Sequence, residues 1–375
     1  MTAKFRRATA TAATGLGLCL TFLPAGQAQA HAPQAPTRVP CNDVAALKTA
    51  ITSANTNGRG IVLAPRCTYF LTAADNADDG LPEITGNVRV SGGEGTTIRR
   101  APGTSAFRIF HVKQGGGLSL ESLTVRGGES APVSASDGGG IYSERGTVRL
   151  TDVTVRSNTS SGLGGGIASL RGRLLLKDTT VRDNSASWGG GVGTSGTMTM
   201  RGGALSDNEV SNWGGGLANG GGTQLDHVSV DDNVTGQLGG GIATMAVNDE
   251  SGPLRMNFTR VRGNIAQIDG GGMYLGADEP TTLFRSSVSR NVANGGPGKG
   301  GGIANPGVSL DLHIDAGTTG KRKQSTAAQT GFEVNLVRSA VFKNTPTDCA
   351  PPGSVPRCDA VGSAPGKNTT KPGRS

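Results

Sequence analysis

Two closely similar stretches decide the fold: NSASWGGG at Asn184–Gly191 and NEVSNWGGG at Asn208–Gly216. The glycine triplet recurs along the chain in steps of 23, 26, 25, 25, 25, 31 and 30 residues. The triplets begin at Gly115, Gly138, Gly164, Gly189, Gly214, Gly239, Gly270 and Gly300. An apolar residue follows each triplet, from Leu118 to Ile303. A repeat of this length is typical of solenoids, whose units bury their apolar side chains only by stacking on one another.

The repeat also carries an asparagine three residues after an aliphatic residue, as in Val155 and Asn158. The asparagines at this position are Asn158, Asn184, Asn208, Asn233, Asn264 and Asn291. The pattern therefore predicts that each repeat unit forms three short strands separated by turns. Stacked strands place equivalent residues ~4.8 Å apart, close enough for the asparagine amides to form a hydrogen-bonded ladder. The glycines supply the positive φ and the close backbone approach that the turns require.

Composition supports a turn-rich, all-β solenoid of roughly ten coils at ~4.8 Å per coil. Glycine accounts for 62 of 375 residues and aromatic residues for 4%. Collagen is excluded because the glycines lack a three-residue period. A helical solenoid is disfavoured because glycine costs roughly 1 kcal/mol relative to alanine inside a helix. One short helix is expected near the start, where Val44, Leu47, Ile51 and Ala54 share a face and Asn42 or Asp43 is its N-cap. It would cap the first coil.

Two resemblances refine this fold. The repeat resembles that of the polymorphic outer membrane proteins, because the motifs GGGI, GGGV and GGGL are followed by aliphatic-x-x-Asn. It departs from that repeat in having a third glycine in place of alanine and Val or Leu in place of Phe. CNDVAALKTAITSAN (Cys41–Asn55) and GIVLAPRCTYFLT (Gly60–Thr72) are similar to the opening of secreted bacterial β-helix proteins of the pectin-lyase-like superfamily. The resemblances cover roughly residues 41–345 and imply a single-stranded right-handed parallel β-helix. The superfamily includes pectin-active enzymes and adhesins, so the resemblance leaves the function open.

The chain is expected to contain four segments. Residues 1–30 are a signal peptide, with a basic start, an apolar stretch and small residues before the cleavage point. Residues 31–40 are a linker, 41–348 the β-helix with its cap, and 349–375 a basic, disulfide-closed and disordered tail. No later stretch approaches the ~20 apolar residues that span a bilayer, so no integral membrane segment is expected. The mature chain should be secreted, extracellular and associated with the cell wall or another surface.

Four cysteines remain after removal of the signal: Cys41, Cys67, Cys349 and Cys358. They allow three pairings, and an exported protein meets oxidising conditions. Proximity in sequence favours Cys41–Cys67 and Cys349–Cys358. A zinc site is the alternative, but the CxxC and HxxxH spacings are missing. We therefore expect two disulfides and no metal site.

Charge argues against nucleic acid as a partner. The net charge is +8, but residues 1–30 hold three basic residues and residues 321–375 hold nine basic and three acidic residues. Residues 31–320 then carry 24 basic and 25 acidic residues, a balance of −1. A nucleic-acid-binding protein concentrates positive charge on its folded body. We expect a monomer that contacts a polysaccharide or a cell-envelope surface.

One row of acids is the best candidate for chemistry. Asp183, Asp207 and Asp232 precede the ladder asparagines on adjacent coils. They would stand close enough to share a cation or shift one another's pKa. Alternatively they are solvent-screened turn residues, since two like charges at 4 Å cost only about 1 kcal/mol in water. The Gly-His-Gly and Arg-Ile-Lys words of related enzymes are absent. No cofactor is expected, and Ca²⁺ would enter only if the chain were a lyase.

Trp188 and Trp213 occupy the same position, directly before the glycine triplet, in adjacent coils. An exposed pair would form a sugar-binding platform. Leu163 and Leu238 hold the position on either side, however, and a row of leucines favours burial. The sequence as a whole predicts a secreted or cell-surface β-helix protein that binds glycan, cell wall or another surface without catalysis. The alternative is a lyase or hydrolase of an acidic polysaccharide.

Overall fold

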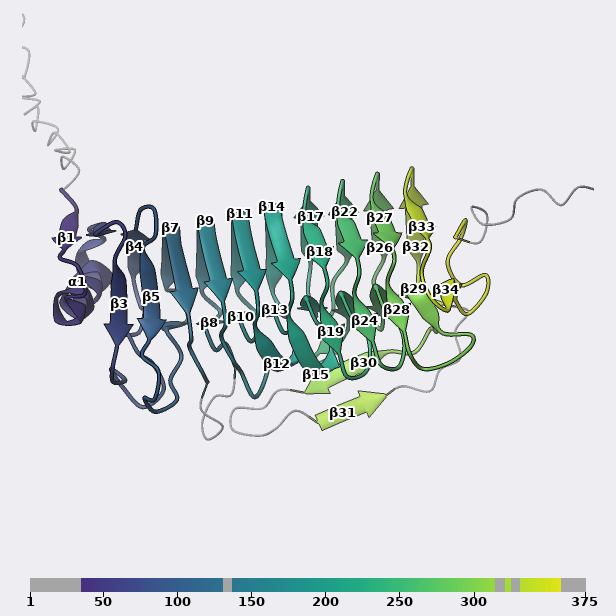
Figure 1. Cartoon of the computed structure of the whole chain (residues 1–375), viewed down its shortest axis with the longest axis horizontal. Helices are drawn as coiled ribbons and strands as arrows, with labels where there is room; N and C mark the ends of the chain where they lie inside the picture. The colour runs from purple at the N-terminus through teal and green to yellow at the C-terminus, as the bar shows by residue number, and fades with distance from the viewer. Residues whose placement is uncertain (1–34, 131–136, 314–320, 325–330, 359–375) are drawn as a thin grey trace, which may run out of the picture. The chain divides into compact units, whose positions relative to one another are not determined.

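The computed structural model of the chain describes residues 35–130, 137–313, 321–324 and 331–358. The chain divides into two units, residues 1–34 and 35–375, and the description concerns the second. The predicted signal peptide and residues 359–375 of the predicted tail lie outside the described residues. The second unit is a parallel β-solenoid of about ten stacked coils, which confirms the predicted fold class (Figure 1).

Two large sheets and one small sheet form the walls of the solenoid. The 17-stranded sheet contains β1 (Thr37–Val39), β2 (Ile61–Leu63), β3 (Thr68–Leu71), β4 (Asn87–Ser91), β5 (Thr97–Arg100), β7 (Gly117–Arg126), β9 (Thr147–Arg156), β11 (Arg173–Arg182), β14 (Thr197–Ser206), β17 (Thr223–Asp226), β18 (Ser229–Asp231), β22 (Leu254–Asn257), β23 (Arg260–Arg262), β26 (Thr281–Phe284), β27 (Ser287–Ser289), β32 (Val334–Val337) and β33 (Ala340–Phe342).

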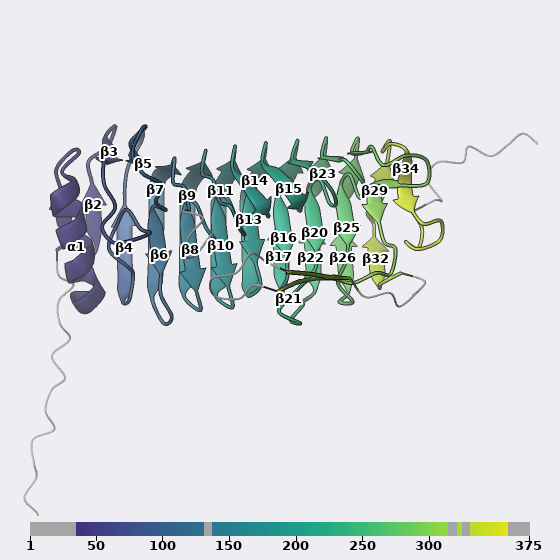
Figure 2. The same cartoon turned by 90° about the horizontal axis from the view of Figure 1, so that it is seen from below.

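The nine-stranded sheet contains β6 (Phe110–Val112), β8 (Ile141–Glu144), β10 (Ile167–Leu170), β13 (Val192–Thr194), β16 (Leu217–Asn219), β20 (Ile242–Thr244), β25 (Met273–Leu275), β29 (Gly300–Ala304) and β34 (Thr347–Ala350). These strands lie side by side in Figure 2. The five-stranded sheet contains β12 (Ser185–Trp188), β15 (Glu209–Trp213), β19 (Val234–Thr235), β24 (Ile265–Ala266) and β28 (Val292–Ala293). A separate three-stranded sheet contains β21 (Ala246–Val247), β30 (Leu310–His313) and β31 (Lys321–Gln324).

Backbone turns with positive φ shape the coils. One lies within the 17-stranded sheet and bends each coil at Ser122, Asp152, Asp178, Gly202, His227, Phe258, Arg285 or Arg338. A second lies directly before the ladder asparagine, at Ser157, Asp183, Asp207, Asp232, Gly263, Arg290 or Lys343, and Gly127 holds the same place before Gly128 in an earlier coil. We call these two series the bend row and the corner row. Their residues share a backbone conformation rather than a side-chain chemistry.

The predicted asparagine ladder is present. The Nδ2 of each asparagine donates to the Oδ1 of the next: Asn158 to Asn184 at 3.0 Å, Asn184 to Asn208 at 3.0 Å and Asn208 to Asn233 at 2.9 Å. The same oxygen also accepts the backbone N–H of the preceding coil, as Asn208 does from Asn184 at 3.1 Å. All six predicted asparagines are almost fully buried. The ladder continues to Asn344 and ends on Asp348 Oδ1, at 2.9 Å for each step.

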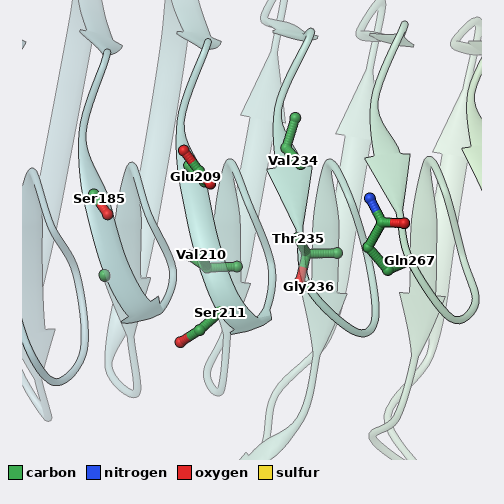
Figure 3. A pocket seen from close by; sticks show the side chains of 9 residues that line it. Ser185, Glu209, Val210, Ser211, Val234, Thr235, Gly236 and Gln267 are labelled. Carbon is green, nitrogen blue, oxygen red and sulfur yellow. The ribbon is translucent and has the colours of Figure 1, made fainter.

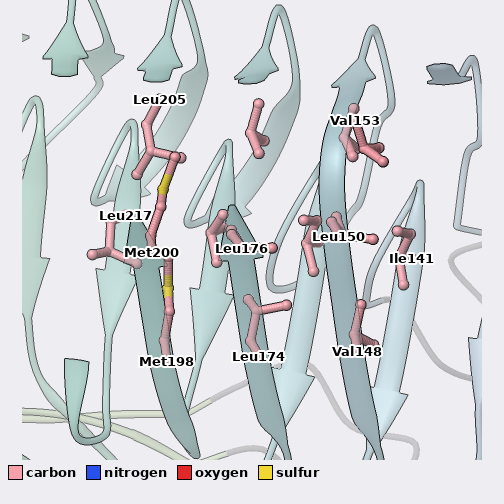
Figure 4. Close-up of a cluster of buried hydrophobic side chains, with 14 of the residues drawn as sticks. Ile141, Val148, Leu150, Val153, Leu174, Leu176, Met198, Met200, Leu205 and Leu217 are labelled. Atoms are coloured by element: carbon pink, nitrogen blue, oxygen red, sulfur yellow. The ribbon is translucent and has the colours of Figure 1, made fainter. Parts of the chain in front are cut away.

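Aliphatic side chains fill the interior between the sheets (Figure 4). Helix α1 (Val44–Asn57) begins after Asp43, whose carboxylate accepts the N–H of Ala46 at 2.9 Å. The helix buries Leu47, Ala50, Ile51 and Ala54 against the first coil. The cap helix was thus predicted correctly, with Asp43 rather than Asn42 as its N-cap.

Both ends differ in detail from the expected segments. Thr37–Val39 lies in the segment expected to be a linker, yet it pairs with Ile61–Leu63 and starts the 17-stranded sheet. The last two residues of strand β34 and the chain as far as Cys358 fall in the segment expected to be a disordered tail, and Val355 and Cys358 join the core. The two predicted disulfides are formed, with Cα–Cα distances of 5.7 Å for Cys41–Cys67 and 6.2 Å for Cys349–Cys358. One disulfide lies near each end of the solenoid.

Candidate functional site

The predicted carboxylate row lies on the solvent side of the corner row. Asp183, Asp207 and Asp232 are exposed, with φ of 55°, 54° and 56°. Asp183 also pairs with Arg182. Asp tolerates this left-handed conformation better than most residues do, so local backbone geometry accounts for its repeated use. The structure therefore gives these carboxylates no buried or enclosed setting that would tune them for catalysis.

The tryptophans differ from one another. Trp213 is 2% exposed and packs with Leu163 and Leu238, whereas Trp188 is half-buried against the same cluster. This second apolar cluster also contains Ala218 and Ala243, whose neighbours Leu217 and Ile242 belong to the interior core. Because side chains alternate across a strand, the cluster covers the outer face of the nine-stranded sheet. Burial of Trp213 follows the predicted direction. The half-buried Trp188 does not form an exposed aromatic pair with it.

A row of arginines on the 17-stranded sheet was not foreseen. Arg99 pairs in register with Arg126, Arg126 with Arg156, and Arg156 with Arg182. These four residues, which we call the arginine row, lie on four successive coils ~4.8 Å apart. Each follows a core residue, as Arg156 follows Val155, so the arginines point outward. All four are half-buried.

The arginine row is electrostatically unfavourable by itself. Like charges directly opposite one another in a sheet destabilise it. The pKa of Arg156 is lowered by its burial first, then by Arg126 and Arg182, while Asp183 opposes the shift. Among the ion pairs of the described residues, only Asp183 supplies a carboxylate to this row. It pairs with Arg182 at the end of the row, so the other three arginines form no ion pair with a described acidic residue.

Threonines accompany the arginine row. A threonine lies two residues before each arginine of the row, on the same outer face. These threonines also pair in register with one another, and they are Thr97, Thr124, Thr154 and Thr180. The surface thus presents a line of hydroxyl groups beside a line of guanidinium groups. Both are hydrogen-bond donors, and guanidinium matches carboxylate geometry in a bidentate manner. The surface suits an extended ligand that carries repeated acidic groups.

The sequence contained a signal for this row. An arginine directly follows the core residue in four successive units, at Ile98–Arg99, Val125–Arg126, Val155–Arg156 and Val181–Arg182. The balance of −1 over residues 31–320 conceals a local cationic line, because the acids lie elsewhere on the solenoid. Only the pairing register shows that the four arginines are neighbours.

A second unforeseen feature is a buried charged cluster beside β6. Arg108 is 0% and Asp79 1% exposed, and Arg108 Nε lies 3.1 Å from Asp79 Oδ1. His111 Nδ1 lies 3.2 Å from Asp79 Oδ2 and 3.7 Å from Glu83 Oε1. Lys113 Nζ lies 3.6 Å from the same Glu83 oxygen. The cluster joins the segment that precedes β4 to the strand β6.

Asp79, Glu83 and His111 each offer one ligand atom, and these atoms lie within 4.8 Å of one another. A divalent cation prefers carboxylates that are free to neutralise its charge. Here Arg108 already faces Asp79 and Lys113 already faces Glu83. The charges are therefore balanced within the chain, and the donor set does not fit a dedicated metal site. We assign the cluster to holding the covering segment against β6.

Two further groups lie next to the cluster. Burial raises the pKa of Asp137, although the N–H of Leu163 and the charge of Arg108 oppose the shift. Burial also raises the pKa of Tyr142, and the charges of Asp137 and Glu144 add to the effect. The Arg108 guanidinium lies 4.9 Å from the centre of the Tyr142 ring. Tyr142 and Asp137 are 8% and 7% exposed, so an extended ligand on the surface has no direct access to their side chains.

A shallow hollow of about 570 Å³ lies on the five-stranded sheet (Figure 3). It is lined by Ser185, Ala186, Glu209, Val210, Ser211, Val234, Thr235, Gly236 and Gln267. Glycosidic cleavage commonly uses a pair of carboxyl groups that flank the bond. The lining of this hollow contains one, Glu209, so it gives no support to a hydrolase.

Comparisons with protein families, with curated proteins and with solved structures find no match. The resemblances noted above therefore rest on the residues quoted for them. No described helix is long and apolar enough to cross a membrane.

Proposed function

We propose that this protein is a non-catalytic, extracellular β-solenoid that binds an acidic polysaccharide along the arginine row. The observation that carries the proposal is the register that sets Arg99, Arg126, Arg156 and Arg182 side by side on one outer face. A polymer lying along the solenoid axis meets one guanidinium per coil. Its carboxylate or sulfate groups relieve the repulsion within the row and form charge-assisted hydrogen bonds.

The setting of the row favours binding over cleavage. General acid–base catalysis needs groups whose pKa is tuned close to the working pH, next to the reacting bond. Threonine hydroxyls line the row, and the one described carboxylate in an ion pair with it, Asp183, is exposed. The two disulfides are compatible with an extracellular location, where cell-envelope polysaccharides are encountered. The alternative function, a lyase or hydrolase of the same polymer class, is tested in the same experiment.

Binding is measured by isothermal titration calorimetry with polygalacturonate, with neutral dextran and double-stranded DNA as comparison polymers. Arg156→Gln removes one central guanidinium and should weaken polygalacturonate binding about tenfold, since a hydrogen bond to a charged group contributes about 1.5 kcal/mol. The control is Arg149→Gln, an exposed arginine of the same strand whose register partners are Ser119 and Leu175. It should change affinity less than about twofold.

The affinity of the unmodified protein should also fall with salt, because the contacts are ionic. Equal losses in the two variants, or equal binding of dextran, would refute the proposal. DNA binding as tight as polygalacturonate binding would show a general polyanion surface instead of a glycan site. The same mixtures, with and without Ca²⁺, are assayed for unsaturated products and new reducing ends. Release of either kind of product would show that the protein cleaves the polymer, and the lyase or hydrolase function would then replace the binding function.

A further inference from the structure

An exposed cluster of aromatic and cationic side chains lies at the bend of the 17-stranded sheet. The rings of His227 and Phe258 are stacked, with centres 4.7 Å apart and planes 11° apart. Phe284 meets Phe258 edge-on at 5.7 Å. The Arg285 guanidinium lies 5.5 Å from the centre of Phe258 and 5.3 Å from that of Phe284. We call these four residues the aromatic corner.

Exposure sets this corner apart from most of the described aromatic residues, although Phe70 is also 39% exposed. Aromatic residues are only 4% of the chain, and Tyr69, Phe107 and Phe110 are fully buried. Phe258 is 42% exposed, and Val337, the register partner of Phe284, is also 42% exposed. The fold gains little from an aromatic ring left in water. Contiguous exposed apolar surface on a soluble domain more often marks an interaction site.

The backbone beneath Phe258 supports the same conclusion. Phe258 belongs to the bend row and has a φ of 49°. A bulky residue is an outlier in this conformation, which Asp178 and Gly202 occupy in earlier coils. The chain therefore places Phe258 at a position that disfavours it and does not bury it in return. Such an outlier calls for a functional explanation.

The far side of the corner is suited to a hydroxylated ring. His227 stacks on Phe258, and the next residue of the bend row, toward the N-terminus, is Gly202, which has no side chain to cover the imidazole. A Cβ on Gly202 would lie 2.3 Å from Asp178 Oδ1, so the Asp178 carboxylate reaches over the glycine. The notch thus offers the flat face of His227 and the exposed Asp178 carboxylate, whereas the Arg285 guanidinium lies on the opposite side of Phe258. A pyranose ring presents C–H groups to aromatic faces and hydroxyl groups to carboxylates.

The corner lies on the same sheet as the arginine row. Arg182 pairs with Ser206, and Ser206 with Asp231, which ends the strand that follows His227. A polymer that follows the arginine row and passes Arg182 therefore reaches the aromatic corner two coils further along, after it crosses the short strand β18. We propose that the aromatic corner is a stacking subsite for one pyranose unit of the acidic polysaccharide bound by the arginine row. This inference rests on the proposed function and adds that the ligand is recognised by its sugar rings as well as by its charge.

The test compares polygalacturonate with poly-glutamate, a polyanion without sugar rings. The variant is His227→Asn, because His227 presents the open aromatic face of the notch and has a φ of 56°, a left-handed conformation that asparagine tolerates. It should weaken polygalacturonate binding about fivefold, as expected for loss of one aromatic stacking contact. Poly-glutamate binding should not change. The control is Ile268→Asn, since Ile268 is 42% exposed but lies between β24 and β25, away from the corner and the arginine row.

The outcomes separate the two proposals. If Arg156→Gln weakens binding of both polymers and His227→Asn weakens only that of polygalacturonate, both proposals stand. If His227→Asn changes the binding of neither polymer, or of both equally, the stacking subsite is refuted and the arginine row remains. If His227→Asn weakens polygalacturonate binding but Arg156→Gln has no effect, the arginine row is refuted instead. Far-UV circular dichroism confirms that each variant keeps the β-solenoid before binding is measured.

Discussion

The asparagine ladder and the corner row are one residue apart in the chain and lie on opposite sides of the wall. Inside, every ladder position from Asn158 to Asn344 is asparagine, because each amide must donate to one coil and accept from another. Outside, the corner row accepts Ser157, Asp183, Gly263 or Arg290, because it needs only a positive φ. Invariance inside the solenoid therefore reports a structural requirement, the hydrogen bonds that only the asparagine amide completes. Function is better sought in outward rows that depart from the repeat, such as the arginine row.

The sharpest form of this comparison is a pair of neighbouring substitutions. Asn208→Ala leaves the backbone N–H and Nδ2 of buried Asn184 without their acceptor, and should cost about 3–5 kcal/mol of unfolding free energy. Asp207→Asn changes an exposed residue that keeps its left-handed conformation, and should stay within about 0.5 kcal/mol. Urea denaturation measures both. Comparable losses would mean that the carboxylate row does more than form a turn.

The two tryptophans extend the comparison to a row at the boundary between inside and outside. Trp213→Ala should cost about 3–5 kcal/mol, because it empties a buried position between Leu163 and Leu238. Trp188→Ala should cost about 1–2 kcal/mol, because this ring is already half in contact with water. Acrylamide should quench the remaining tryptophan more strongly in Trp213→Ala than in Trp188→Ala. If quenching were stronger in Trp188→Ala, then Trp188 and not Trp213 would be the buried tryptophan of the second apolar cluster.

The smallest effect is expected at Asp137, which holds the same position before the glycine triplet. Burial raises its pKa above 3.8, so the unfolded chain releases this proton at a lower pH than the folded protein does. Stability is thus lost as the pH rises from that value through the folded pKa. Asp137→Asn keeps an acceptor for Leu163 and removes this loss. The melting temperature of the variant relative to the unmodified protein should increase from pH 4 to pH 8.

Asp269→Asn is the control at the same position in a later coil. Its carboxylate lies 3.4 Å from Lys299 Nζ, so removing the charge removes an ion pair instead of relieving a buried acid. This variant should therefore gain no stability at neutral pH. An equal gain in both variants would show that burial of Asp137 is not the cause.

The sequence predicted most of the repeating structure, because a single coil recurs and each departure is visible against the others. It did not predict Asn344 as the next ladder residue, since 53 residues separate it from Asn291. Part of that interval forms β30 and β31, which pair with each other and, through β30, with β21. An insertion of this kind breaks the sequence period while the spatial stacking continues. The spacing of the sequence motifs alone therefore could not identify Asn344 as the next residue of the ladder.

Some features were determined by the sequence itself: the stacked coils, the inward asparagines, the cap helix, and the pairing of neighbouring cysteines. All of these depend on contacts that are local or repeated at a constant interval. The arginine row, the aromatic corner and the buried Asp79–Arg108 pair were decided only by the tertiary structure. Each unites residues about 25 to 30 positions apart whose meeting depends on register and on which face a side chain points to. A shift of one residue would move every such side chain to the opposite face.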